Sequence, residues 1–312
     1  MSSNDKATRD SFGEALRKLG EEFPNIVALD ADLSVSTKSA TFGKAFPDRF
    51  FQMGIAESNM IGTAAGLAFT GFVPFLCSFG AFVAGRYETI RVSVGYSRAN
   101  VKIVGTHAGL GIGEDGYTQM GLEDVNVMRG VPGMTILQPC DDLTTHAAVR
   151  FAATHPGPVY LRLTRQKLPP MYRSVQVFQA GRGILLKEGR EVALIASGAT
   201  VCEALRASEE LTDASPWVID MHTLKPIDRA LVKSLAHSCH TIFTVEDHNI
   251  VGGLGSAVAE VLAEEGFPGK LVRLGVQDVY GESGPATALY EKYGISSSRI
   301  ASRVRAALAA RG

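Results

Sequence analysis

The sequence of 312 residues has few cysteines and almost no net charge. No CxxC pair occurs and no histidine lies at ligand spacing from a cysteine, which argues against a zinc site or a disulfide framework. Reduced thiols of a cytoplasmic protein are the simplest interpretation. The 31 basic and 32 acidic residues leave a formal charge of −1, too small for a field that attracts nucleic acid or an anionic membrane. The cysteines are Cys77, Cys140, Cys202 and Cys239.

Long apolar segments of the targeting or membrane-spanning kind are also missing. The N-terminal stretch MSSNDKATRDSF is polar and lacks the apolar core of a signal peptide. Residues 60–84 come nearest to a membrane span, but threonine, serine, proline and several glycines interrupt the run. We therefore expect no membrane association and predict burial of this segment between layers of protein.

Helix and strand patterns alternate through the first 165 residues. This alternation predicts a parallel sheet covered by helices on both faces, with ligands at the carboxyl ends of the strands. The predicted strands span residues 25–32, 49–54, 73–79, 101–107, 134–139 and 158–164, and the predicted helices span residues 7–23, 57–70, 81–94, 121–131 and 141–154.

A stretch rich in proline, glycine and charge separates this pattern from a second, shorter alternation of strands and helices. We predict a first domain over residues 5–168, a linker over residues 169–188 and a second domain over residues 189–312. The predicted fold class is α/β, and each domain is expected to hold a mostly parallel sheet with helices on both faces.

One carboxylate, Glu57, enters a run that is otherwise small and apolar, MGIAESNMIGTAAGLAFTG at residues 53–71. No residue from Ser58 to Thr70 ionises, and apolar residues recur at helical spacing. The pattern predicts a buried helix with Glu57 in its first turn. A carboxylate that only caps the helix is the alternative interpretation.

The loop THAGLGIGEDGYTQMGLEDV, residues 106–125, gathers polar side chains after a predicted strand. His107 ends the strand, and Glu114, Asp115 and Gln119 follow before the next predicted helix. The spacing does not match a calcium loop, a Rossmann fingerprint or a Walker loop. A purely structural glycine turn does not call for His, Asp and Gln together, so we predict a ligand site here.

Four segments together resemble the second half of transketolases, the thiamine-diphosphate enzymes. The segments are MGIAESNMIGTAAGLA, THAGLGIGEDGYTQMGLED, LRLTRQ and VEDHNIVGGLGSAVAEVLAE. The resemblance covers nearly the whole chain and implies a thiamine-diphosphate pyrimidine-binding domain followed by a transketolase C-terminal domain.

The GDG motif with its following Asn, by which the family grips the cofactor's diphosphate through Mg²⁺, does not occur here. The resemblance therefore implies an N-terminal-type partner subunit that carries the diphosphate-binding domain and holds the Mg²⁺, in an α2β2 assembly. We expect no metal ligand on this chain.

The activity implied is that of one subunit of a split transketolase. Such an enzyme transfers a two-carbon ketol unit from a ketose phosphate to an aldose through a thiamine-bound dihydroxyethyl intermediate. Three alternatives stay open. They are the β subunit of the decarboxylating component of a 2-oxoacid dehydrogenase, a deoxyxylulose-phosphate-synthase-like enzyme, and a non-enzymatic scaffold. The residues His107, Asp115 and Arg165 suit a polyol phosphate better than a short oxoacid.

The resemblance also implies roles at the cofactor. Glu57 would hydrogen-bond a ring nitrogen of the aminopyrimidine, and the apolar neighbours Ile55, Ala56 and Met60 would favour the proton-donating form of its carboxyl. Phe79 and Phe82, in SFGAF, resemble the aromatic residues that stack on the pyrimidine, with Tyr87 as a further candidate. An ordinary place in the core is the alternative for these rings.

On the substrate side, Arg9, Asp32 and Ser36 resemble the sugar-phosphate pocket of the family, and Arg165 resembles its second phosphate arginine. Forked guanidinium donors match the oxygens of a phosphate, although a lone arginine is more often a surface charge.

His107 resembles the histidine that binds the donor ketose and shuttles protons, and Asp115 resembles the residue that reads a sugar hydroxyl. Gln119 stands where many members have a second histidine, and Tyr117 stands where Pro is common, which predicts a narrower substrate channel. The segment VEDHNIVGGLG is expected to pack subunits together rather than to cradle a phosphate.

Overall fold

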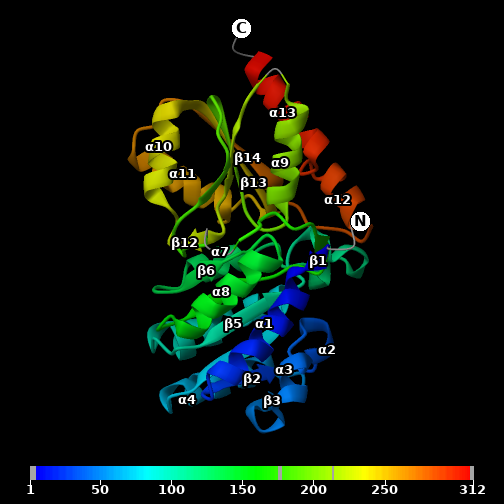
Figure 1. Cartoon of the computed structure of the whole chain (residues 1–312), viewed down its shortest axis with the longest axis vertical. Coiled ribbons are helices and arrows are strands. Elements are labelled where there is room, and N and C mark those ends of the chain that lie inside the picture. Colours follow the sequence, from blue (N-terminus) through cyan, green and yellow to red (C-terminus); the bar gives the residue numbers. More distant parts are fainter. Residues whose placement is uncertain (1–4, 175–177, 213, 310–312) are drawn as a thin grey trace.

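A seven-stranded sheet forms the centre of the first domain (Figure 1). The computed structural model describes residues 5–174, 178–212 and 214–309. In this sheet every neighbouring pair is parallel except the pair of β12 with β6 at one edge. In order across the sheet, the strands are β12 (Thr223–Lys225), β6 (Thr135–Leu137), β7 (Val159–Arg162), β5 (Lys102–Thr106), β4 (Val73–Phe79), β2 (Ile26–Asp30) and β3 (Phe50–Gln52).

Helices cover both faces of this sheet, because successive strand residues point to opposite sides. On β2, Ile26 belongs to the apolar cluster that contains Phe12 of α1, whereas Val27 belongs to the cluster that contains Met60 of α4. Helices α1 and α8 lie side by side across the first of these faces (Figure 1). The longer helices of the domain are α1 (Thr8–Glu22), α4 (Glu57–Phe69) and α8 (Asp142–Thr154), and the shorter α7 (Asp124–Arg129) follows the glycine-rich loop.

The helix expected over residues 81–94 is broken into three pieces. They are α5 (Gly80–Ala84), α6 (Tyr87–Thr89) and a π-helical stretch, Ile90–Tyr96. Two further short helices follow β2, α2 (Ser34–Thr37) and α3 (Ala40–Ala45), and a 3₁₀ turn covers Pro47–Arg49. No helix within the described ranges combines the length and the apolar character that crossing a bilayer requires.

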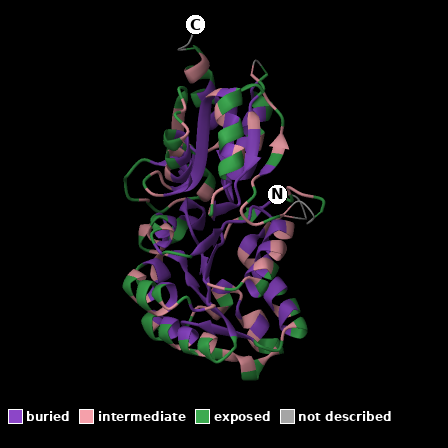
Figure 2. Ribbon diagram, turned by 90° about the vertical axis from the view of Figure 1, so that its left-hand side faces the viewer, coloured by how far each residue is buried: buried purple, intermediate pink, exposed green. Residues whose placement is uncertain are grey.

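The second domain is built on a five-stranded sheet that is parallel except for the antiparallel edge strand β9. Both domains show buried strands between helices whose outer faces are exposed (Figure 2). The strands in spatial order are β14 (Lys270–Val276), β13 (Cys239–Asn249), β10 (Glu191–Ala196), β11 (Trp217–Asp220) and β9 (Ile184–Lys187). The helices are α9 (Thr200–Glu210), α10 (Arg229–Ser238), α11 (Leu254–Glu264), α12 (Ala286–Lys292) and α13 (Ser297–Ala309).

The predicted α/β class, with two domains of mostly parallel sheets, is confirmed by this arrangement. Two strands near the predicted boundaries belong to other parts of the structure than the predicted ranges suggest. Strand β12 lies within the second range of the sequence but pairs with the first sheet, and β9 lies inside the stretch 169–188 that was expected to link the domains. A two-stranded ribbon of β1 (Lys6–Ala7) and β8 (Lys167–Leu168) joins the N-terminal end of the described chain to the same junction.

A buried polar cluster lies at the domain junction. Asp220, at the end of β11, accepts hydrogen bonds at Oδ2 from the thiol of Cys140 (3.3 Å) and the hydroxyl of Tyr172 (2.8 Å). Its Oδ1 is buried and has no hydrogen-bond partner among the described residues. Burial, reinforced by the nearby charge of Asp141, raises the pKa of Asp220 to about 7. Below about pH 7 the folded protein therefore favours the protonated, neutral form of this carboxyl.

Replacing Asp220 by asparagine is expected to flatten the dependence of stability on pH. The folded pKa lies above the unfolded value of 3.8, so the folded state holds this proton more tightly and the associated stability is lost as pH rises from about 4 to about 7. The difference between wild type and Asp220→Asn should change by up to about 1.4 kcal/mol per pH unit in that window. Urea unfolding of both proteins at pH 5 and pH 7.5 measures this difference in the free energy of unfolding. An equal difference at the two pH values would contradict the assignment.

Candidate active site

The ends of two adjacent strands bring an aromatic platform and a histidine together. Phe79 ends β4, and His107 directly follows β5. The ring of His107 stacks on Phe79 with a centroid distance of 3.8 Å, and Phe79 stacks in turn on Phe82 of α5 at 5.3 Å. The backbone of His107 is left-handed, with φ 57°, a strained conformation of the kind found at functional sites. These side chains thus lie at the carboxyl edge of the sheet, where the sequence predicts a ligand site.

Arg9, from the first turn of α1, reaches the same point. Its Nη1 lies 2.6 Å from Nε2 of His107 and 3.1 Å from the backbone oxygen of Ser36, to which it donates. Its Nε is buried and finds no partner within the described part of the chain. The predicted residues Arg9, Ser36 and His107 are therefore neighbours, and Arg9 keeps an unused donor for a ligand.

Cations surround His107. Burial, together with the positive charges of Arg9, Arg165 and Lys38, lowers its pKa to about 3, so the imidazole is neutral at physiological pH. Burial and the charge of Arg165 also lower the pKa of Arg9. Nη1 of Arg165 itself lies 3.0 Å from the Ile112 carbonyl oxygen and 3.1 Å from a carboxylate oxygen of Asp115. The positive charges beside a neutral ring favour a bound anion, although Lys38 is itself paired with Asp10 (3.2 Å).

The segment after β2 is shaped by Asp30, whose role sequence reasoning did not identify. Its buried carboxylate accepts from the Leu33 amide (2.6 Å) and from the hydroxyls of Thr37 (2.7 Å) and Ser39 (2.8 Å). These bonds hold the turn that presents Ser36 and Lys38. Asp32 is exposed on this turn, its amide donates to Gln52, and no contact joins it to Arg9, so its substrate role stays a prediction.

The second domain supports the glycine-rich loop. Asp247, on β13, accepts the amides of Leu110 (2.6 Å) and Gly111 (3.1 Å) and the hydroxyl of Tyr290 (2.7 Å). Gly109, with φ 85°, passes so close that a Cβ there would lie 2.3 Å from the Asp247 carboxylate. The loop therefore requires glycine at this position and depends on the second domain for its shape.

Within this loop, two 3₁₀ turns carry the remaining predicted residues. Asp115 is exposed and pairs with Arg165, and the half-buried Gln119 lies on the second turn, which packs against α5. The ring of Tyr117 packs edge-on against Tyr280 of the second domain, with a centroid distance of 4.4 Å. The turns are Leu110–Asp115 and Tyr117–Gln119.

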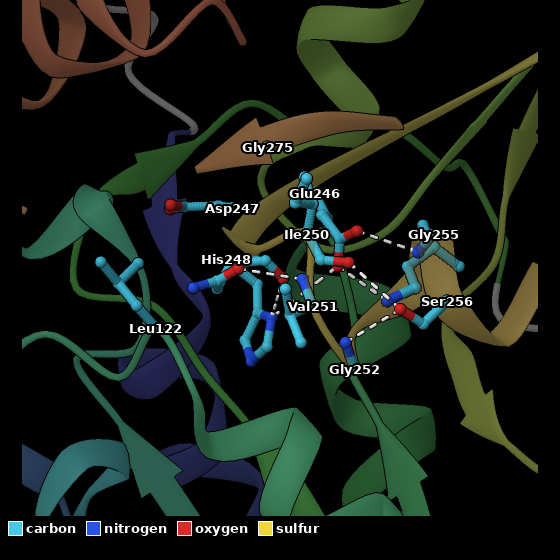
Figure 3. A network of polar contacts seen from close by, with 12 residues as sticks. Leu122, Glu246, Asp247, His248, Ile250, Val251, Gly252, Gly255, Ser256 and Gly275 are labelled. Carbon is cyan, nitrogen blue, oxygen red and sulfur yellow. Dashed lines mark hydrogen bonds and ion pairs between the residues drawn. The ribbon is translucent and has the colours of Figure 1, made fainter. Parts of the chain in front are cut away.

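The segment VEDHNIVGGLG forms a buried network around the end of β13 (Figure 3). Glu246 accepts the amides of Leu254 (2.7 Å) and Gly255 (2.9 Å), so its own carboxylate occupies the α11 N-terminus where a phosphate would bind. His248 hydrogen-bonds the carbonyl oxygen of Asn249 (2.6 Å). These side chains are buried within one chain. The described contacts of this segment lie within one chain, and its expected role in packing subunits together stays a prediction.

Glu57 is the first residue of α4, and only 8% of its side chain is exposed. One carboxylate oxygen lies 3.5 Å from Nη2 of Arg86, an exposed cation that sequence reasoning did not connect with it. The apolar enclosure expected from Ile55 is wrong for this chain alone, since Ile55 is 82% exposed. Met60 is buried beneath the helix as expected.

Helix α4 is buried on one face only, so the prediction of a buried helix is wrong for its other face. Met60, Ile61, Ala64 and Ala65 pack into the domain. The opposite face is exposed although it has no ionisable residue, which is unusual for a helix surface in contact with water. The exposed residues are Ser58, Asn59, Gly62, Gly66 and Phe69, and together they define the α4 face.

The side chains present fit one half of an aminopyrimidine cofactor. Phe82 is half-buried and stacks nearly parallel on the buried Phe79, with 15° between their planes, so Phe82 offers an aromatic face that Phe79 supports. Glu57 offers a carboxyl that is largely withdrawn from water. Tyr87 packs instead against the apolar cluster beneath α4. Over the described residues, no group of three or more His, Cys, Asp or Glu side chains is placed to hold a metal ion.

Comparison with known proteins agrees with this architecture. Residues 4–171 match the family model of the transketolase pyrimidine-binding domain, and residues 181–300 match that of the transketolase C-terminal domain. The chain is 46% identical over 304 residues to the "Putative transketolase C-terminal section" of Methanocaldococcus jannaschii, with 96% of this chain and 95% of that protein covered.

Two further matches cover nearly the full length of both chains. The 6-deoxy-6-sulfo-D-fructose transketolase subunit SqwH of Clostridium sp. is 40% identical over 302 residues, which cover 96% of this chain and 92% of that protein. A solved structure described as a split gene transketolase, inactive beta4 tetramer, is 47% identical with a TM-score of 0.89, and the match covers 97% of this chain and 98% of that one. The family implies a thiamine diphosphate-dependent transferase, and a C-terminal section implies a partner subunit with the N-terminal part. The chain therefore belongs to the transketolase family and comprises its pyrimidine-binding and C-terminal domains.

Proposed function

We propose that this chain is the subunit of a split transketolase that binds the pyrimidine half of thiamine diphosphate and the anionic end of a sugar. The enzyme would move a two-carbon ketol unit from a ketose phosphate to an aldose. The observation that carries the proposal is the placement of His107 between an aromatic platform, Phe79 and Phe82, and a cationic group, Arg9, Arg165 and Lys38.

When bound, thiamine diphosphate supplies the nucleophilic carbon and the electron sink for cleavage of the carbon–carbon bond. Glu57 is assigned the contact with the aminopyrimidine, to which a neutral carboxyl donates its proton. The stacked rings of Phe79 and Phe82 hold the heterocycle in one orientation and keep water from its face. Arg86 must then leave Glu57, because a paired carboxylate accepts rather than donates.

The cationic side chains are assigned the terminal anion of the sugar. Arg9 and Arg165 present forked donors that match phosphate oxygens, and the unused Nε of Arg9 adds one more donor. The neutral ring of His107 lies between this anion site and the aromatic platform, where the reacting carbons would be held. Asp115 and Gln119, from the loop beside Arg165, are assigned the sugar hydroxyls in between.

A partner subunit completes the site. The α4 face and the exposed side chain of Ile55 (82% exposed) form an uncharged surface next to Glu57. We assign this surface to the subunit that carries the diphosphate-binding half and holds Mg²⁺, in an α2β2 assembly. A relative of 47% identity is described as an inactive beta4 tetramer, which supports the expectation that this chain is inactive without its partner.

Reconstitution tests the proposed function. The purified chain should transfer no ketol unit, whereas addition of the N-terminal-type subunit, thiamine diphosphate and Mg²⁺ should give transfer from ketose phosphates. Product formation followed by coupled assay over a panel of donors measures it. Ketol transfer by the chain alone, or pyruvate decarboxylation by the pair, would contradict the assignment.

The panel should include a sugar that ends in a sulfonate. A relative of 40% identity is named for 6-deoxy-6-sulfo-D-fructose, and a cationic pocket attracts a sulfonate as well as a phosphate. We commit to phosphate because two arginines and the unused Nε donor suit its dianion. A higher kcat/KM for the sulfonate donor would reverse the choice of phosphate over sulfonate. It would not contradict the reaction class.

A further inference from the structure

Tyr290, on α12 of the second domain, has a buried hydroxyl between two polar groups. The hydroxyl donates its proton to Oδ2 of Asp247 (2.7 Å), because a carboxylate only accepts. Its oxygen is then free to accept from Nε2 of Gln166 (2.9 Å). Gln166 belongs to the first domain and directly follows Arg165. One hydroxyl of the second domain thus reaches the neighbour of an arginine that we assign to the sugar's terminal anion.

Asp247 extends this connection to the glycine-rich loop. Its carboxylate, which points away from that of Glu246 (Figure 3), accepts the amides of Leu110 (2.6 Å) and Gly111 (3.1 Å). In the described part of the chain, neither amide has another acceptor. The carboxylate is therefore the polar group that fixes the backbone of the loop immediately before Ile112.

The two ends of Arg165 are held by different parts of the molecule. Its backbone follows Thr164, whose amide donates to the hydroxyl of Thr8 within the first domain (2.8 Å). Its guanidinium donates from Nη1 to the carbonyl oxygen of Ile112 (3.0 Å) and pairs with Asp115 (3.1 Å), and both partners lie on the loop. A shift of the loop would therefore move the guanidinium while it leaves the backbone of Arg165 in place.

We propose that Tyr290 is a positioning residue for the sugar's terminal anion. It holds Asp247 and Gln166, so that the loop keeps the Arg165 guanidinium aimed into the anion site. The inference rests on the proposed function for the identity of the anion. It gives the second domain a share in substrate affinity, although every residue that we assign to the substrate belongs to the first domain. A hydroxyl that served stability alone would change the kinetics of all substrates alike.

Kinetics of the reconstituted pair test this role with two substrates, a ketose phosphate and the matching ketose that ends in a hydroxyl. Tyr290→Phe removes one hydroxyl, and we expect it to raise KM for the phosphate roughly 10-fold, the worth of about one hydrogen bond, with little change in kcat. The ketose without the anion should keep its wild-type kcat/KM, because it gains nothing from Arg165. An equal loss for both substrates, or a wild-type KM for the phosphate, overturns the proposal.

Tyr293→Phe is the matched control. Tyr293 directly follows the same helix, and its hydroxyl contacts the carbonyl oxygen of Tyr280 (3.1 Å) and the carboxylate of Glu282 (3.2 Å) at an exposed site. The same substitution there should leave the kinetics of both substrates unchanged. A rise in KM for the phosphate as large as that of Tyr290→Phe would show a general effect of α12 and contradict the proposal.

Binding of inorganic phosphate to the full chain is a readout that needs neither the partner subunit nor activity. In NMR spectra of ¹⁵N-arginine-labelled chain, phosphate should shift the side-chain signal of Arg165, which Arg165→Lys assigns. The Kd should be roughly 10-fold higher in Tyr290→Phe than in wild type. Equal Kd values overturn the role of Tyr290. A wild-type Arg165 signal that does not respond to phosphate overturns it as well, together with the proposed anion site.

Two further outcomes are separable. If Tyr290→Phe does not fold by circular dichroism, Gln166→Met takes its place, because it removes the donor to the same hydroxyl. The same direction of change is then expected, and an unchanged Kd for phosphate contradicts the proposal. If the wild-type pair shows no ketol transfer, the proposed reaction fails, whereas the phosphate titration still decides whether Tyr290 positions Arg165.

Discussion

Glu57→Gln is expected to lower the turnover of the reconstituted enzyme by roughly 10²- to 10⁴-fold, the range of a lost general acid. The amide keeps the size of the carboxyl and a hydrogen-bonding group, but it has no proton to give up at neutral pH. The fold should persist, because the contact recorded for the carboxylate is an ion pair with the half-exposed Arg86, and such pairs contribute about 0–1 kcal/mol. Steady-state kinetics together with thermal unfolding of the isolated chain measure both effects.

Arg86→Gln is the matched control, because it breaks the same ion pair from the other side. If Glu57 serves only to pair with Arg86, the two variants should lose the same activity. If Glu57 donates a proton to the cofactor, Arg86→Gln should keep near wild-type turnover, since Arg86 must leave the carboxyl in the assembled enzyme. A Glu57→Gln enzyme with wild-type turnover would remove this carboxyl from the mechanism.

Much of the fold could be predicted from the sequence because its strands are short apolar runs that alternate with amphipathic helices. Strand β12 could not, since three residues, Thr223–Lys225, gain their partner only when the second domain folds back on β6. The helix expected over residues 81–94 was interrupted because local periodicity does not report the turn at Gly85 and Arg86 or the π-helical winding that follows.

The exposed side of α4 shows a different limit of prediction from sequence. An uncharged run predicts burial, but it does not say which chain provides the cover. The face with Gly62, Gly66 and Phe69 is open in this chain, although the opposite face is packed as expected. We attribute the pattern to the proposed assembly rather than to the isolated fold.

For the site, residue types near strand ends predicted a ligand loop, but the individual roles depended on resemblance. Arg9 and His107 are 98 positions apart, and only the folded structure puts them in contact. Lys38 was missed because it reaches the site from another element, and nothing in the local sequence pointed to it.

Gly62→Arg is expected to abolish assembly with the partner subunit while it leaves the chain folded. Gly62 is exposed in the middle of α4, and a Cβ there would meet no atom within 4 Å, so the isolated chain has room for the side chain. Arginine also has the better helix propensity, by about 0.8 kcal/mol. In the complex, however, its charge would be buried against an apolar surface without a counter-ion, which should weaken binding by at least roughly 100-fold.

Ala306→Arg provides the control, since it adds the same charge at an exposed position of a helix, α13 of the second domain. Analytical ultracentrifugation of chain and partner, with the ketol-transfer rate of the mixture, separates the two variants. Gly62→Arg should remain as separate subunits without activity, and Ala306→Arg should assemble and react as wild type does. Because Glu57 begins the same helix, a partner held on the α4 face would lie next to the carboxyl to which we assign the proton donation. If Gly62→Arg bound the partner subunit as tightly as wild type does, the partner would have to lie on another surface. The α4 face would then have no part in assembly, and the partner would not complete the site at Glu57 through it.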